Sequence, residues 1–275
     1  MQDMEPHRPK EPTEPDKRAG QDEIDASKAP LMEHLIELRQ RLIHSLLAFF
    51  GFFILCFFVA TPIFKILAWP WERVAGPGTM QATLLLEELF TKIKVAMFGA
   101  AFLSFPFAAY QIFKFVAPGL YKNEKDAFRP YLLWTWLLFM LGACVVYFVM
   151  MPLVVSFAYS GATAGGTDKV FELKPTIAGY LSLIMQLILG FGVVFQLPVI
   201  LALLAQAGVV TAQNLKDFSR YAIVAIAAVS AVLSPPDPFS MLAMMAPTIG
   251  LYYVGIWVVQ RIETARDKAD KIDKS

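Results

Sequence analysis

The stretch YLLWTWLLFMLGACVVYFVMMPLVVSF, residues 131–157, contains no charged side chain. A helix that crosses a membrane needs about 20 consecutive apolar residues, so this stretch predicts one. The whole chain has the same character, because 57% of its 275 residues are hydrophobic and only 17% are charged. A soluble domain would carry more charge and fewer than the 23 phenylalanines found here. We therefore expect an all-α membrane protein.

Apolar stretches on both sides of this one predict further membrane helices. The fifth and sixth are shorter than the others and are separated only by SPPDP, residues 234–238. A short helix requires local thinning of the bilayer or a protein neighbour. A re-entrant loop is the alternative for this pair, and it would move the C-terminus to the other side. The six expected spans are residues 42–66, 93–117, 131–157, 177–206, 221–233 and 239–259.

The positive charges indicate the orientation of these spans. Lysines and arginines concentrate in cytoplasmic segments of membrane proteins. The two tails and the second and fourth loops together carry 17 of them, whereas the three opposite loops carry four. Both termini are therefore expected on the cytoplasmic side.

Four prolines lie inside the expected spans: Pro106, Pro152, Pro198 and Pro247. A proline removes a backbone hydrogen bond and can kink its helix, although membrane helices tolerate it when neighbours replace the lost bond. We expect kinked helices that form a curved wall.

The polar ends predict the domain organisation. Residues 1–30 are rich in Pro, Glu, Asp and Lys and are expected to be a disordered tail. Residues 31–260 form the six-helix membrane domain in this reading, and residues 261–275 form a charged cytoplasmic tail.

Nothing in the sequence predicts covalent chemistry. Cys56 and Cys144 lie in apolar runs without metal-ligand spacing and are expected to be small buried hydrophobic residues. The three histidines form no cluster, and no nucleophile, phosphate-binding or zinc motif is present. We expect no enzyme activity, no cofactor, no metal and no nucleic-acid partner.

The segment MEHLIELRQRL, residues 32–42, predicts an amphipathic helix that continues into the first span. Glu37 and Arg41 have the i, i+4 spacing and the favourable order, which is worth about 0.2–0.5 kcal/mol. A structural role is thus sufficient to explain these charged residues: Glu37 stabilises the helix, and the arginines keep the N-terminus on the cytoplasmic side. The apolar stripe of this helix consists of Leu31, Leu35, Leu38 and Leu42.

A second charged segment, KFVAPGLYKNEKDAFRP, occupies residues 114–130. Asn123 can cap the third span, and Glu124 then favours the helix dipole by about 0.3–1 kcal/mol. The expected topology puts this segment and Glu37 on the same cytoplasmic face. Carboxylates accept guanidinium groups in a bidentate manner, so a ligand that carries arginine suits this face.

Three motifs together resemble the TatC family, the large membrane subunit of the twin-arginine protein translocase. They are HLIELRQRL before the first span, FVAPGLYKNE after the second, and SPPDPFS between the fifth and sixth. Their order and spacing match the family over about residues 30–260.

The resemblance implies a function and a site. TatC proteins of the bacterial cytoplasmic (inner) membrane bind twin-arginine signal peptides of folded precursors. They form multimeric complexes with small single-span partners, TatA and TatB, and use the proton-motive force. By the family's motifs, Glu37 and Glu124 contact the signal arginines, and Arg39 and Phe115 belong to the same surface.

The resemblance also implies functional positions outside the cytoplasmic face. On the far side of the membrane, Pro70, Glu87 and Asp237 match residues of the family. Ser234 lies in a region that, in the family, contacts partner helices. From the residues alone, the preferred interpretation of Asp237 is a cap of the sixth helix, since Asp-Pro-Phe-Ser is ordinary helix-start chemistry.

Two positions depart from the family pattern. The family typically has a glutamate in the fourth span where FGVVFQLPV places Gln196, which cannot carry charge. Met241 replaces a glutamine that TatC-like chains carry shortly after PPDxFS.

Two other functions have to be weighed. A small-solute secondary transporter needs ionisable groups near the midplane, and the six spans hold none there, with Gln196 the only well-placed amide. An intramembrane enzyme needs a catalytic set that the spans do not contain.

Overall fold

A computed structural model describes most of the chain. Side chains at several helix ends, including residues 14–34 and 115–120, fall outside the description. The chain divides into two compact units, Met1–His44 and Ser45–Ser275. The described backbone covers residues 14–76, 80–81, 86–120, 128–163, 175–234 and 238–273.

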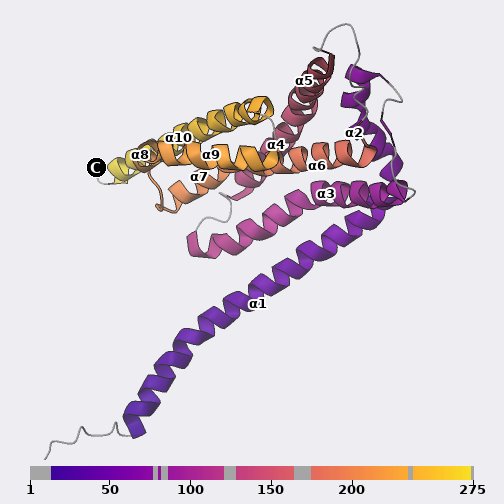
Figure 1. Cartoon of the computed structure of the whole chain (residues 1–275). Coiled ribbons are helices and arrows are strands. Elements are labelled where there is room, and N and C mark those ends of the chain that lie inside the picture. Colours follow the sequence, from indigo (N-terminus) through magenta and orange to yellow (C-terminus); the bar gives the residue numbers. More distant parts are fainter. Residues whose placement is uncertain are drawn as a thin grey trace, which may run out of the picture. The chain divides into compact units, whose positions relative to one another are not determined.

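The described backbone is almost entirely helical, which confirms the predicted all-α class. Its one β-type contact is an isolated bridge between Gln81 and Thr176. The helices, shown in Figure 1, are α1 Glu14–Phe58, α2 Ala60–Ala75, α3 Glu87–Leu120, α4 Phe128–Val145, the π-helix η1 Val146–Met150, α5 Met151–Thr163, α6 Ile177–Val194, α7 Leu197–Gln206, α8 Ala212–Asp217, α9 Ser219–Leu233 and α10 Pro238–Asp273.

Five helical segments in the described ranges are long and apolar enough to cross a membrane. The expected fifth span coincides with α9, a shorter apolar helix at Ser219–Leu233, so a count of six spans stays a prediction. The five segments are Leu35–Phe58, Glu87–Lys114, Tyr131–Ala158, Ile177–Gln206 and Ser240–Lys268.

The first span differs from its predicted bounds of 42–66, because the helix is interrupted at Val59. Pro62 explains the interruption: it has no N–H for the carbonyl of Phe58, where α1 ends. Pro198 has the same effect. It has no N–H to donate to the carbonyl of Val194, which is the last residue of α6. Proline therefore ends a helix four residues upstream in both places.

Pro152 acts differently. It follows the π-helix η1, where the N–H of Met151 bonds to the carbonyl of Val146, five residues back. A π-turn of this kind accommodates a missing i, i−4 bond within a continuing helix. Pro106 and Pro247, by contrast, lie inside the uninterrupted helices α3 and α10.

Two predicted polar tails have helical segments in the structure. Helix α1 begins at Glu14, within the tail expected to be disordered. Helix α10 continues to Asp273, through the charged C-terminal tail. The domain boundaries at residues 30 and 260 stay predictions.

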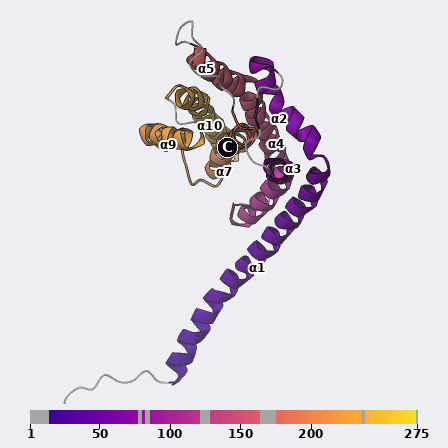
Figure 2. The same ribbon diagram turned by 45° about the vertical axis from the view of Figure 1, so that its right-hand side comes forward.

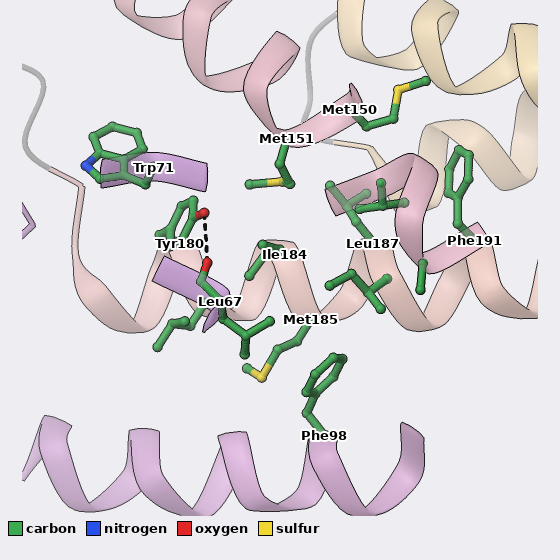
Figure 3. Packing of buried hydrophobic residues seen from close by; sticks show 14 of the residues in the cluster. Leu67, Trp71, Phe98, Met150, Met151, Tyr180, Ile184, Met185, Leu187 and Phe191 are labelled. Atoms are coloured by element: carbon green, nitrogen blue, oxygen red, sulfur yellow. Dashed lines mark hydrogen bonds between the residues drawn. The ribbon is translucent and has the colours of Figure 1, made fainter. Parts of the chain in front are cut away.

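Helix α6 is central to the second unit. The apolar window of Ile177–Gln206 is 56% buried, against 33% for Ser240–Lys268. It packs against α2, α3 and α4. Helix α2 also lies beside α5, as Figures 1 and 2 both show. Figure 3 shows the resulting core, in which Ile184, Leu187 and Phe191 of α6 meet Met151 from α5 and Phe98 from α3.

Close packing of α4 against α6 depends on two glycines. A Cβ atom on Gly192 would lie 2.4 Å from Cε2 of Phe139, and one on Gly142 would lie 2.9 Å from the carbonyl oxygen of Phe191. Both distances are too short for a real Cβ atom. The missing side chains therefore set the spacing of these helices.

Cys56 is buried as expected, but Cys144 is exposed, so the prediction that Cys144 is buried was wrong.

The expected loop at 207–220 contains the short helix α8, which starts after the capping hydroxyl of Thr211. Tyr252 of α10 donates to the carbonyl of Leu215 at 2.7 Å, which attaches α8 to α10.

Candidate functional site

The first candidate residue, Glu37, lies on α1 and forms the predicted ion pair with Arg41. The Arg41 guanidinium donates to Oε1 of Glu37. The Glu37 side chain is 40% exposed while that of Arg41 is 11% exposed, so the carboxylate is the more accessible partner. Arg39 is exposed on the same helix. This turn of α1 thus presents a carboxylate that already accepts an arginine.

The leucine stripe of this helix is exposed at all three described positions. Leu35, Leu38 and Leu42 have exposed fractions of 58%, 43% and 66%. An exposed apolar stripe beside a charged face is typical of a helix that lies at a membrane surface or meets another protein.

Three predicted site residues lie outside what the structure describes. They are Glu124, in the segment between α3 and α4; Asp237, between α9 and α10; and the side chain of Phe115, on the final turns of α3. The proximity of Glu124 and Phe115 to Glu37 stays a prediction, and so does the role of Asp237 on the opposite side of the membrane.

Gln196 lies at the break between α6 and α7 and is only 6% exposed. Its Nε2 atom donates to the carbonyl oxygens of Thr135 at 3.0 Å and of Gly192 at 3.3 Å. The amide group therefore connects α4 to the interrupted helix. A carboxylate could not make these bonds, because both partners are acceptors.

The side-chain oxygen of Gln196 accepts no hydrogen bond in the part of the chain that the structure describes. Oε1 of Gln196 and Oγ1 of Thr135 are both buried there without a hydrogen-bond partner. Unsatisfied buried oxygens are costly and uncommon in proteins. The pair is a small polar spot in an apolar interior, and it carries no charge.

Glu87 stands at the start of α3 and is 5% exposed. Its Oε1 atom accepts the N–H of Ala178 at 3.0 Å, in the first turn of α6. Thr176 caps the same helix by accepting the N–H of Gly179 at 3.1 Å. A carboxylate near two helix N-termini is electrostatically favourable. This geometry assigns Glu87 a structural role in joining α3 to α6.

A cavity of about 370 Å³ lies next to Glu87. Thr91 and Lys92 of α3 and Phe64 of α2 contribute to its wall. The Thr91 hydroxyl is buried and has no partner among the described residues, whereas Lys92 pairs with Glu88 at 2.7 Å.

Pro70 is buried within α2, a helix where the sequence predicts a loop from residue 67 onward. Its neighbours hold this helix against α6: Tyr180 donates to the carbonyl of Leu67 at 3.1 Å, as Figure 3 shows. The ring of Trp71 meets that of Tyr180 edge-on at 5.6 Å. Pro70 therefore belongs to the packing of α2.

Ser234 follows α9 as its C-terminal cap residue, and its N–H donates to the carbonyl of Ser230 at 2.8 Å. Ser234 is half-buried.

Gln196 and Glu87 each have a defined set of contacts in the second unit, but these contacts do not form one common site. No group of three or more His, Cys, Asp or Glu residues suited to a metal occurs in the described ranges.

Comparison with known proteins gives one consistent result. The family described as "Sec-independent protein translocase protein (TatC)" matches residues 33–247. A protein of that name from Magnetococcus marinus is 39% identical over 249 residues, which cover 90% of each chain. The one from Escherichia coli K12 is 34% identical, over 83% of this chain and 87% of the relative.

Solved structures agree with the sequence comparison. A crystal structure entitled "Twin Arginine Translocase Receptor- TatC" superposes with a TM-score of 0.74 at 34% identity. The match covers 82% of this chain and 98% of that one.

Proposed function

Because the chain belongs to the TatC family of Sec-independent protein translocase proteins, we propose that it is the receptor for twin-arginine signal peptides. It is a multi-pass protein of the bacterial inner membrane and a subunit of the Tat translocase. In our proposal it binds the Arg-Arg motif of folded precursors on the cytoplasmic face. Glu37 and Glu124 accept the two guanidinium groups, and Arg39 and Phe115 complete the surface.

One observation supports the role of Glu37 in particular. Its carboxylate is partly exposed and is already occupied by the guanidinium of Arg41. An arginine from a signal peptide would use the same acceptor with the same geometry, because a carboxylate binds the planar guanidinium through charge-assisted hydrogen bonds. The pair thus resembles the complex that we propose.

The partners in this proposal are TatA- and TatB-like single-span proteins, whose helices associate with the region around Ser234 and Asp237. Gln196 is neutral and uses its amide hydrogens within the chain. A role that needs titration is therefore not part of our proposal for this position, and the proton-motive force is proposed to act through the assembled complex.

Site-directed cross-linking to a twin-arginine precursor tests the proposal. Glu37→Ala and Glu124→Ala are each expected to reduce cross-linking, and a precursor with Lys-Lys in place of Arg-Arg is expected to bind weakly, because lysine lacks the bidentate fork. Glu88→Ala is the control, since Glu88 is an exposed carboxylate paired with Lys92. Undiminished cross-linking in both site variants would refute the assignment.

A further inference from the structure

A second cavity, of about 630 Å³, lies among α4, α7 and α10 in the unit Ser45–Ser275. We call it the α4–α10 groove. Among the residues that the structure describes, no charged side chain contributes to its wall. Its principal lining residues are Trp134, Leu138, Pro198, Val254, Trp257 and Ile262.

The groove opens toward the outside of the helix bundle. Its lining residues Trp134, Val254 and Trp257 are 57%, 49% and 55% exposed. All three belong to segments that are long and apolar enough to cross a membrane. The environment at its opening is therefore the bilayer, and the molecules available to fill it are lipid chains or an apolar helix.

The ends of two apolar segments put one end of the groove at the expected boundary of the membrane. Tyr131 and Gln206 line it there, and they are the first and last residues of their membrane-crossing segments. Tyrosine and tryptophan concentrate at the level of the lipid headgroups. The expected topology makes this the cytoplasmic boundary, where anionic lipids attract basic side chains.

A fixed positive charge stands at the same end. The guanidinium of Arg261 lies over the ring of Trp257, 4.9 Å from its centroid. Arg261 is exposed, and no carboxylate of the described chain lies within ion-pair distance of it. The neighbouring Glu263 is engaged elsewhere, since it accepts the N–H of Ala212 at 2.9 Å.

We propose that the α4–α10 groove binds an acyl chain of an anionic phospholipid, with the lipid phosphate at Arg261. The apolar wall matches a hydrocarbon chain, and the arginine at its interfacial end matches a phosphate. A partner helix fits less well, because membrane helices pack closely where small residues let their backbones approach, whereas the bulky side chains of Trp134 and Trp257 stand in this wall.

Native mass spectrometry of the full-length protein, released from nanodiscs, tests this proposal. The probes are phosphatidylglycerol and phosphatidylcholine with identical acyl chains. We expect tighter binding of phosphatidylglycerol, and we expect Arg261→Gln to weaken it about fivefold while leaving phosphatidylcholine unchanged. Val254→Trp should fill the groove and reduce the binding of both lipids.

Arg220→Gln is the matched control, because Arg220 stacks on Tyr221 at the same 4.9 Å but lies outside the groove. Equal effects of Arg220→Gln and Arg261→Gln would overturn the phosphate assignment. Unchanged lipid binding in Val254→Trp, or loss of a single-span partner from that variant while lipid is retained, would overturn the acyl-chain assignment.

Discussion

The side-chain amide of Gln196 donates to the carbonyl oxygen of Thr135 at 3.0 Å, and this bond joins the break between α6 and α7 to α4. The TatC resemblance leads one to expect a glutamate at this position. The structure gives a reason why glutamine suits this chain: the group must donate, since its two partners are backbone oxygens.

Replacing this amide by a carboxylate should destabilise the protein. Gln196→Glu loses two hydrogen bonds worth about 1 kcal/mol each and puts a charge next to two acceptors, so we expect a loss of at least about 2 kcal/mol. Thermal unfolding in detergent measures it. Gln213→Glu is the control, because Gln213 is exposed on α8, outside the apolar segments, and its amide donates to the Oδ1 atom of Asp217 at 3.0 Å. Equal stability of the two variants would contradict the role of Gln196.

The contact of Glu87 with the start of α6 predicts a capping energy. Glu87→Ala removes the acceptor for the N–H of Ala178 and should cost about 0.5–2 kcal/mol. Glu87→Gln keeps an acceptor oxygen and should cost less. The midpoint of thermal unfolding separates the two, and Glu88→Ala, at an exposed position, should leave it nearly unchanged.

The helix spacing at Gly192 predicts a steric effect. In Gly192→Ala the new methyl group would meet the ring of Phe139, and we expect a loss of about 1–3 kcal/mol. Gly250→Ala is the comparison, since no described atom outside its own stretch of helix lies within 4 Å of its Cβ position. That change should stabilise α10 by up to about 1 kcal/mol. A well-tolerated Gly192→Ala would show that α4 and α6 can separate freely.

The ion pair on α1 predicts competition for Glu37. An arginine from a signal peptide must displace or share the bond from Arg41. Ion pairs at the i, i+4 spacing of a helix are worth about 0.3–0.5 kcal/mol, so Arg41→Gln should strengthen peptide binding about twofold. Titration with a labelled twin-arginine peptide measures this affinity. Weaker binding in Arg41→Gln would mean that Arg41 supports the peptide site instead of competing with it.

Several features of the structure could be predicted from the local spacing and composition of the sequence. The apolar stretches predict the all-α class and the segments that form the long helices, because length and hydropathy alone decide whether a helix suits a bilayer. The pair of Glu37 and Arg41 is also local, since four residues make one turn. Both predictions are confirmed.

Other features could not be obtained in this way. The break at Val59 escaped the prediction, although Pro62 is its visible signal in the sequence. The bond from Ala178 to Glu87 joins residues 91 positions apart, and no periodicity encodes such a pairing. Helix α8 was missed because six residues carry too little pattern.

By itself, the sequence determined the class of protein, the segments apolar enough for a membrane, and the charged face of α1, because each depends on neighbouring residues and on transfer from water to lipid. The tertiary structure decided the roles of Gln196, Glu87 and Pro70 and the shape of the α4–α10 groove. These depend on which distant backbone atoms and rings meet, and only the packing of the helices brings such atoms together.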